Sequence, residues 1–218
     1  MDAPDAAFEL PLFLLNSVLF PQAAIELRVF EPRYRKMVEF CRHHDNIFGV
    51  LLIRSGQEVG GPAEPFTVGT TSHIEKLGHQ EDGTLALSAR GVRKFTLHSV
   101  IDWEPFPRGL VSYLDDSPKI PDDEVVQRVR DVSLKCIRAI LGLNGEWTRE
   151  FDLPKNPGDL SYLIAARLPI SLMTKQSLLE TPDTEARLKM EEPLLERQRQ
   201  ELHEQLLASM WLRSFRLN

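Results

Sequence analysis

"LPLFLLNSVLFPQAAIELRVFEPRYRKMV", residues 10–38, is the stretch that decides the fold. It is densely apolar at first, contains three prolines, and then becomes charged. Phe8–Leu14, which overlaps its start, predicts a strand. Within Ala23–Phe30, apolar residues alternate with charged ones, which predicts a second strand with one buried face. Glu31-Pro32 then predicts the start of a helix, because proline fits the first helical turn.

The rest of the first half also predicts strands, because apolar runs and alternating patterns are separated by turn residues. These strands cover Ile47–Ile53, Phe66–Leu77, Thr84–Ala89, Val92–Val100 and Gly109–Leu114. Gly91 interrupts the pattern and indicates a bulge or a sharp bend. The glycine- and proline-rich segment Ser55–Pro65 predicts a loop. Several short strands joined by turns favour a strongly curved sheet or a small barrel.

The pattern changes after a proline-containing linker, Asp115–Pro121. From Asp122 the apolar residues recur at helical spacing, and further helices are predicted over Asp159–Leu168 and Leu172–Leu179. A long last helix begins near Thr181 and is expected to kink at Pro193. We therefore predict an α+β chain with two domains. Residues 1–116 form a β domain with one inserted helix, and residues 117–218 form a helical domain that ends in a long helix.

Composition restricts the class of protein. The 218 residues carry a formal net charge of −6, and no segment is strongly basic, which disfavours nucleic-acid binding. The apolar runs are far shorter than the ~20 residues that span a membrane, and the N-terminus lacks the basic region of a signal peptide. Cys41 and Cys136 both lie in predicted helices beside apolar neighbours, so we expect buried thiols in a reducing cytoplasm.

The motifs of the common enzyme classes are absent from the sequence. There is no G-x-x-x-x-G-K-[ST] phosphate loop, no G-x-G-x-x-G after a strand and no G-x-S-x-G elbow;. The six histidines form no zinc motif;. Paired carboxylates such as Asp122-Asp123 flank a predicted helix start, where they complement the helix dipole. We therefore predict no catalytic residue, no metal site and no cofactor.

Six stretches carry a resemblance to a known family. They are "LPLFLLNSVLFP", "LRVFEPRYRKMV", "FGVLLI" (48–53), "VGTTSHI" (68–74), "DGTLALSARGVRKFTL" (82–97) and "SLLETPDTEARL" (177–188). Together, and in this order, they resemble the N-terminal substrate-binding domain of the Lon protease family over nearly the whole chain. The resemblance implies a PUA-like curved β domain of six strands, followed by a helical domain.

The resemblance also implies a role. In the full-length protease this region helps to recognise unfolded or tagged substrates and supports assembly, while the ATPase and the Ser–Lys peptidase lie further along the chain. Because the phosphate loop is missing here, the resemblance implies a free-standing Lon N-terminal-like protein with no ATPase domain and no peptidase domain. We accordingly expect a non-enzymatic, cytoplasmic, polypeptide-binding module related to proteolysis and protein quality control.

The expected partners are unfolded or tagged polypeptide clients, together with a protease or chaperone that the protein serves as adaptor or regulator. No membrane contact is expected, and the sequence leaves the oligomeric state open. The alternative is RNA binding, because PUA-like folds often serve that purpose, although the net charge argues against it. An uncatalogued hydrolase is the third hypothesis.

The first predicted binding surface is the turn around Val18, Leu19, Phe20 and Pro21. Large apolar side chains exposed there would suit extended apolar segments of a client. The alternative is that these side chains close one end of the barrel core. The two hypotheses differ in their outcome for Phe20→Asp, which weakens client binding if the turn is exposed and unfolds the protein if Phe20 lies in the core.

The second predicted surface is a charged cluster after the turn, which includes Arg28, Tyr34 and Arg35 together with Glu31 and Arg33. One interpretation is an internal salt bridge that orients the helix. The other is that Arg28 or Arg35 holds a carboxylate of a bound peptide.

Overall fold

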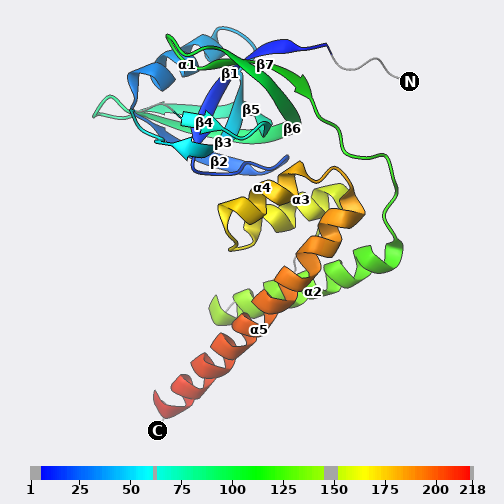
Figure 1. The fold of residues 1–218 in the computed structure, drawn as a ribbon. Coiled ribbons are helices and arrows are strands. Elements are labelled where there is room, and N and C mark those ends of the chain that lie inside the picture. The colour runs from blue at the N-terminus through cyan, green and yellow to red at the C-terminus, as the bar shows by residue number, and fades with distance from the viewer. Residues whose placement is uncertain (1–5, 61–62, 145–151, 217–218) are drawn as a thin grey trace. The chain divides into compact units, whose positions relative to one another are not determined.

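The computed structural model describes residues 6–60, 63–144 and 152–216. Its contacts divide the chain into two compact units. Unit 1 comprises Met1–Asp116 and Ile170–Glu180, and unit 2 comprises Ser117–Pro169 and Thr181–Asn218. Over the described residues the chain is α+β, with one largely antiparallel sheet and five helices (Figure 1).

The sheet lies in unit 1 and has seven strands within the described residues. They are β1 (Phe8–Leu15), β2 (Ala24–Val29), β3 (Ile47–Gly56), β4 (Ala63–Pro65), β5 (Val68–His79), β6 (Leu85–Asp102) and β7 (Arg108–Tyr113). Five strands follow the order β1-β7-β6-β5-β3, and the parallel pairing of β1 with β3 closes them into a ring. The other pairs are antiparallel. Strand β2 pairs with β6, and β4 pairs with β3.

The continuous apolar character of β1 follows from burial on both faces. Leu10, Leu12 and Leu14 belong to one apolar cluster, together with Phe95 of β6. Phe13, which alternates with them, belongs to a second cluster. Successive side chains of a strand point to opposite faces, so a strand buried on both faces shows no polar alternation. The opening stretch of the sequence is apolar for this reason.

Strand β6 is longer than the sequence predicted. We expected two strands separated near Gly91, whereas β6 runs for 18 residues through that position. Thr70 of β5 pairs with Lys94 and Ser72 pairs with Gly91, so β6 carries one extra residue between these two pairs. The expected irregularity is therefore present as a β-bulge, which bends a strand without ending it. The predicted loop Ser55–Pro65 contains the short strand β4.

Two helices accompany the sheet in unit 1. Helix α1 (Pro32–Arg42) begins at a proline in its first turn and buries Tyr34, Met37, Val38 and Cys41. Helix α4 (Leu172–Glu180) is distant in sequence, yet it belongs to the same unit. The side-chain amide of Gln176 donates a hydrogen bond of 3.0 Å to the carbonyl of Val68 on β5. This contact helps to explain why α4 groups with the strands.

A buried lysine makes a second link between α4 and the sheet. The side chain of Lys94 on β6 is 2% exposed, and its ammonium lies 2.5 Å from the Asp116 carboxylate. It also donates a hydrogen bond of 3.3 Å to the carbonyl of Leu179. A buried charge is tolerated only when it is paired and hydrogen-bonded. Lys94 therefore joins β6, the end of the β domain and α4.

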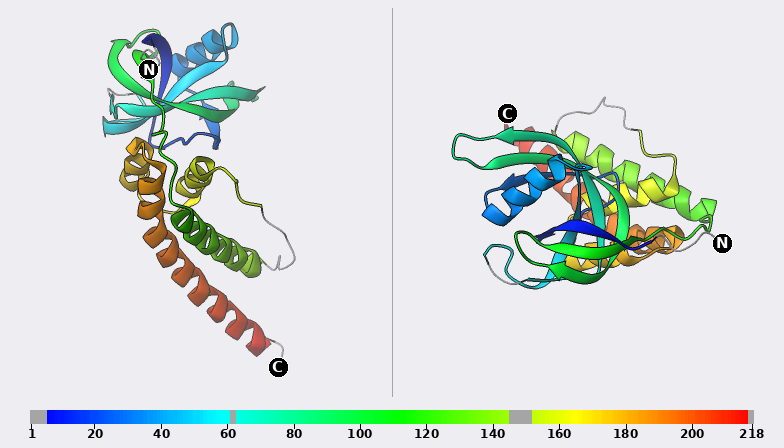
Figure 2. Two further views of the ribbon diagram at one scale, coloured as in Figure 1. Left: turned by 90° about the vertical axis from the view of Figure 1, so that its right-hand side faces the viewer. Right: turned by 90° about the horizontal axis from the view of Figure 1, so that it is seen from above.

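Unit 2 contains the remaining helices, α2 (Asp123–Asn144), α3 (Pro157–Arg167) and α5 (Thr184–Arg216). Helix α2 buries Val125, Val129, Val132 and Cys136, which recur at helical spacing, and it packs along α5 (Figure 2). Asn156 caps α3 by accepting hydrogen bonds from the amides of Gly158 and Asp159. Helix α5 continues through Pro193. Over the described part of the chain, the helices lack the combination of length and apolar content that crossing a membrane requires.

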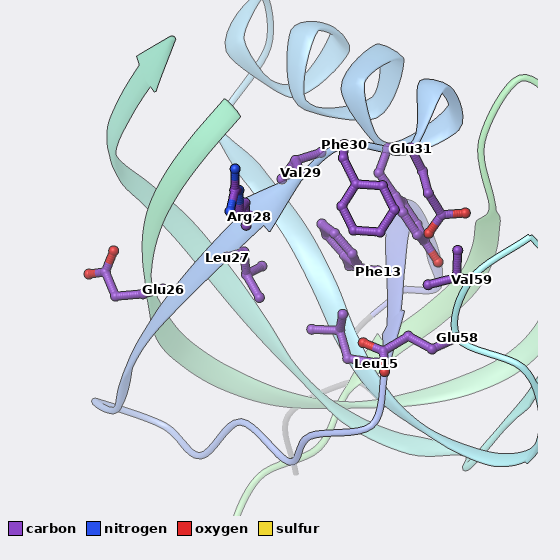
Figure 3. A pocket seen from close by; sticks show the side chains of 11 residues that line it. Phe13, Leu15, Glu26, Leu27, Arg28, Val29, Phe30, Glu31, Glu58 and Val59 are labelled. Atoms are coloured by element: carbon purple, nitrogen blue, oxygen red, sulfur yellow. The ribbon is translucent and has the colours of Figure 1, made fainter. Parts of the chain in front are cut away.

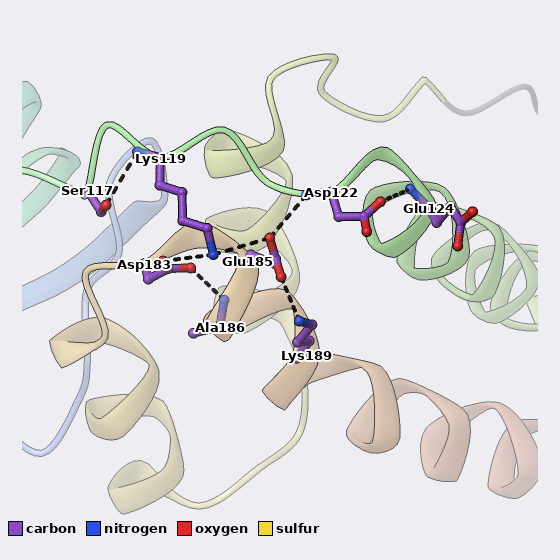
Figure 4. A network of polar contacts seen from close by, with 8 residues as sticks. All are labelled: Ser117, Lys119, Asp122, Glu124, Asp183, Glu185, Ala186 and Lys189. Carbon is purple, nitrogen blue, oxygen red and sulfur yellow. Dashed lines mark hydrogen bonds and ion pairs between the residues drawn. The ribbon is translucent and has the colours of Figure 1, made fainter.

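A polar network ties the linker to the start of α5 within unit 2 (Figure 4). Glu185 is its centre: its carboxylate accepts hydrogen bonds from the Asp122 amide at 3.2 Å and from the Lys189 ammonium at 2.6 Å. The Lys119 ammonium lies 3.5 Å from the same carboxylate. Because Glu185 lies on α5 whereas Lys119 and Asp122 lie in the linker and at its end, the charge of this carboxylate contributes to holding the linker on α5.

The network predicts a loss of stability in acid. The hydrogen bond from Lys189, and then that from the Asp122 amide, lower the pKa of Glu185 from its ordinary value of 4.5 to about 2. A carboxylate with a depressed folded-state pKa stabilises the fold above its unfolded-state pKa, and this contribution is lost as the pH falls towards about 2. We expect Glu185→Gln to flatten the acid-side decrease in the melting temperature of the helices, measured by circular dichroism over a pH series. A variant with the wild-type pH profile would contradict a stabilising role for this carboxylate.

Candidate functional site

A pocket of about 170 Å³ lies beside strand β2 in unit 1, and we call it the β2 pocket (Figure 3). Its walls come from β1, β2, the start of α1 and the segment that follows β3. The residues that line it are Phe13, Leu15, Glu26, Leu27, Arg28, Val29, Phe30, Glu31, Tyr34, Glu58 and Val59.

The β2 pocket has an apolar base and an apolar rim. Phe13, Leu15 and Val29 are buried core residues at its base. Phe30 and Val59 are each 52% exposed, and they reach the pocket from different walls (Figure 3). Adjacent apolar side chains that remain exposed on a folded protein are typical of an interaction surface. The pocket therefore suits an apolar side chain of a ligand.

The pocket also lies along a strand with a free edge. The ring strands β1, β3, β5, β6 and β7 each pair on both sides, whereas within the described residues β2 pairs with β6 alone. The second edge of β2 thus presents backbone N–H and C=O groups that no described strand occupies. An extended peptide can add to such an edge through main-chain hydrogen bonds, which do not depend on its side chains.

Glu31 fixes the outer wall of the pocket. Its carboxylate accepts hydrogen bonds from the Arg33 guanidinium at 3.1 Å and from the Gly60 amide at 3.2 Å. Arg33 also donates to the carbonyl of Glu58 at 3.1 Å. These contacts attach the segment after β3 to the first turn of α1. The internal salt bridge that the sequence offered as one interpretation of the charged cluster is present in the Arg33–Glu31 pair.

The structure brings Arg28 and Tyr34 together at this pocket and places Arg35 outside its lining. The Tyr34 hydroxyl donates to the carbonyl of Leu14 and accepts from the amide of the same residue, at 3.4 and 3.3 Å. Burial raises the pKa of this hydroxyl. Tyr34 is therefore committed to the core, where its ring stacks on that of Phe13. Arg28 is exposed and pairs with Asp82 at 2.8 Å, in a geometry that leaves it open to solvent.

The predicted apolar patch in the first turn is not exposed. Leu19 is 3% exposed and Phe20 is fully buried. Pro21 is also buried, and Val18 is partly buried. The prediction of an exposed surface at Leu19 and Phe20 was wrong, and the alternative, that these side chains belong to the core, describes their burial correctly.

The reason is that the turn is held against the neighbouring strands. The Thr70 hydroxyl donates a hydrogen bond of 2.6 Å to the carbonyl of Leu19. A Cβ atom at Gly91 would lie 2.2 Å from the carbonyl oxygen of Phe20, so only glycine permits this close approach;. The left-handed backbone of Gln22, with φ of 65°, then reverses the chain. Thr70 and Gly91 both lie far along the chain from the turn, so the sequence of the turn does not reveal its burial.

Sequence reasoning missed the apolar rim of the β2 pocket. Phe30 directly follows Val29 in a strand whose apolar residues otherwise alternate with charged ones. Phe30 therefore stands at a position where the alternation predicts a polar side chain, and this departure from the pattern was the available signal. Val59 had no comparable signal, because it lies in a segment read only as a loop.

The cysteines and the metal-ligating residues were the other candidates for chemistry among the described residues. Cys41 and Cys136 are buried free thiols, and burial raises the pKa of Cys41 to about 12. A thiol in such surroundings is a poor nucleophile. Among the residues that the structure describes, histidine, cysteine and carboxylate side chains form no group that could hold a metal ion.

Comparison with known proteins places these features in a family context. A family model described as the ATP-dependent protease La (LON) substrate-binding domain matches residues 9–197. The chain is similar to a crystal structure of a Lon N-terminal domain protein from Xanthomonas campestris, with 30% identity and a TM-score of 0.66, over 84% of this chain and 96% of that one. The N-terminal domain of a Mycobacterium avium complex Lon protease shares the fold at 16% identity and a TM-score of 0.61, over 87% of this chain and 98% of that one.

Curated relatives extend the comparison to complete proteases. Lon protease 2 of Myxococcus xanthus is 28% identical over 203 residues, which are 91% of this chain and 24% of the relative. The Lon protease of Anaeromyxobacter dehalogenans is 27% identical over 191 residues, which are 86% of this chain and 23% of the relative. The chain thus spans about a quarter of the length of these curated relatives.

Proposed function

Because the chain belongs to the family of Lon substrate-binding domains, we propose that it binds unfolded polypeptides and breaks no bond itself. The observation that carries this proposal is the coincidence of a free strand edge with an apolar pocket on β2. Recognition of unfolded chains must tolerate many sequences. Main-chain pairing supplies that tolerance, and an apolar pocket supplies binding energy.

In the proposed complex, an extended client segment lies along β2. Its backbone pairs with the free edge, and one apolar side chain enters the pocket between Phe30 and Val59. Burial of one such side chain contributes roughly 1.5–3 kcal/mol. The pocket is closed on its outer side by the segment that Glu31 holds. Arg28 lies at the rim, where it is placed to meet an acidic group of the client;.

The domain assignment and the cellular role that the family resemblance implies form part of the same proposal. We take unit 1 as a PUA-like barrel and unit 2 as a C-terminal helical domain. The cellular role is that of an adaptor or regulator in cytoplasmic proteolysis or protein quality control. The family match supports recognition of polypeptides, and it lends no support to the RNA-binding alternative.

The proposal predicts that Phe30→Asp weakens client binding. An aspartate at this rim position removes apolar contact and introduces a charge, so we expect binding to weaken roughly tenfold or more. The measurement is fluorescence anisotropy with a labelled, reduced and carboxymethylated polypeptide, in the absence of nucleotide. Because Phe30 is half exposed, the melting temperature is expected to change little.

Val92→Asp is the matched control. Val92 lies on β6, is 51% exposed like Phe30, and does not line the β2 pocket. We expect this variant to bind the client like the wild type. Equal losses in the two variants would show a general effect of added negative charge, and unchanged binding in Phe30→Asp would refute the site.

A further inference from the structure

A second recessed surface lies on unit 1, between helix α1 and strand β5. Two hollows, of about 420 and 230 Å³, share Arg42, Leu77 and His79 in their linings. We call their union the α1–β5 cleft. None of its lining residues lines the β2 pocket, so the two surfaces are separate. The inference drawn from it does not depend on the proposed function.

The cleft concentrates positive charge on a chain whose formal net charge is −6. Arg35, Arg42 and Lys76 line it, and all three are exposed. Within the part of the chain that the structure describes, their side chains have no hydrogen bond or ion pair. By contrast, Arg28, Arg33, Arg90 and Arg93 of the same unit each have a carboxylate partner.

Two carboxylates also line the cleft, and they do not cancel this charge. Glu75 is already engaged, because its carboxylate accepts a hydrogen bond of 2.5 Å from Arg90. Glu39 lies on α1 between Arg35 and Arg42. The remaining polar lining includes His43 and His79. Counting only partners among the described residues, the cleft thus holds three unpaired cations against one unpaired carboxylate.

The base of the cleft is apolar. Val38 of α1 is fully buried, and Ile74 and Leu85 are each 8% exposed at the base. Leu77 is partly buried and lies in both hollows. A fully polar oligoanion would gain nothing from such a base, and the lining offers no phenylalanine, tyrosine or tryptophan ring among the described residues for stacking a nucleobase;. An apolar base together with a cationic rim suits a ligand that carries both apolar groups, for the base, and anionic groups, for the rim.

We propose that the α1–β5 cleft binds an acidic segment of polypeptide in which carboxylates alternate with apolar side chains. The guanidinium groups of Arg35 and Arg42 and the ammonium group of Lys76 pair with the carboxylates. The apolar side chains of the segment cover Leu77 and its neighbours. Because successive side chains of an extended peptide point in opposite directions, an alternating sequence presents each kind of group to its own side of the cleft.

The test uses the full chain and a fluorescein-labelled peptide of alternating glutamate and leucine, followed by fluorescence anisotropy. We expect saturable binding that weakens as the salt concentration is raised. Arg42→Glu should weaken binding roughly tenfold or more, because it replaces an attractive charge in both hollows by a repulsive one. Lys36→Glu is the matched control, since it makes the same charge change on α1 at a residue outside the cleft, and it should alter binding less than about twofold.

Further peptides and variants distinguish the possible ligands. A lysine–leucine peptide should not bind the cleft, and a glutamate–serine peptide should bind it more weakly than the glutamate–leucine one. Phe30→Asp should leave intact the component of binding that Arg42→Glu removes, which separates this cleft from the β2 pocket. The proposal is overturned if Arg42→Glu and Lys36→Glu behave alike. It is also overturned if a single-stranded oligonucleotide or inorganic triphosphate binds the cleft more tightly than the acidic peptide.

Discussion

Phe20→Asp is expected to unfold the sheet of unit 1. The side chain is fully buried in the wild type. Truncating a buried phenylalanine costs about 3–5 kcal/mol, and burying an unpaired carboxylate in its place adds a further penalty. Because domains are typically stable by only about 5–15 kcal/mol, this change removes most or all of the stability. Urea titration followed by circular dichroism measures it.

The control for this prediction is the same substitution at the exposed phenylalanine. Phe30 is 52% exposed, so Phe30→Asp should retain a urea midpoint close to that of the wild type. A wild-type midpoint in Phe20→Asp would contradict the burial of this side chain. The pair of variants also separates two causes of lost client binding. Phe20→Asp is expected to lose binding because the protein unfolds, whereas Phe30→Asp is expected to lose it because a contact at the pocket rim is removed.

The second large effect is expected at Arg187, which lies fully buried in unit 2. Its guanidinium donates hydrogen bonds to the carbonyl of Thr181 at 2.8 Å and to the hydroxyls of Ser161 and Thr184 at 3.1 and 3.2 Å. It also lies 4.3 Å above the Tyr162 ring. The residue therefore connects the beginning of α5 with α3. Arg187→Met leaves several buried acceptors without a donor, and the loss of one partner of a buried polar network costs about 3–5 kcal/mol.

The loss of stability in Arg187→Met depends on Glu191, which interacts electrostatically with Arg187. Glu191 is fully buried and accepts a hydrogen bond of 2.9 Å from Ser161, and burial raises its pKa to about 8, against the opposing effects of Ser161 and Arg187. We expect the double variant Arg187→Met and Glu191→Leu to recover part of the stability, because two apolar side chains then replace a buried polar pair. The measurement is the urea midpoint of the helical signal.

Arg128→Met is the matched control for Arg187→Met. The Arg128 side chain is 51% exposed and pairs with Glu192 at 3.0 Å on the surface of unit 2. Exposed ion pairs contribute about 0–1 kcal/mol, so this variant should melt close to the wild type. If Arg187→Met were no more destabilised than Arg128→Met, the buried network would not be a principal support of the helical unit.

The series of strands and helices was predictable because it depends on local pattern. Alternation in β2, the start of α1 at Pro32 and helical spacing in α2 were read correctly from the residues, as was the irregularity near Gly91. The family was predictable because its motifs are spread in order along the chain. The short strand β4 was missed, since its three residues are too few to show an alternating pattern of their own.

The candidate sites were predictable only in part. Arg28 and Tyr34 do lie together at a pocket, but Leu19 and Phe20 were placed on the surface by the prediction and in the core by the structure. The sequence of a turn does not show whether another strand lies against it. Thr70 and Gly91, which receive this turn, follow it by about fifty and seventy residues.

From the sequence alone came the α+β class, the order of the elements and the family, because these depend on periodicity and on motifs carried by contiguous residues. The tertiary structure alone decided which of two similar phenylalanines is exposed, which cations of the α1–β5 cleft lack a partner among the described residues, and which unit α4 joins. The physical reason is that burial and pairing belong to contacts between segments distant along the chain. A side chain's environment is set by the residues that fold against it.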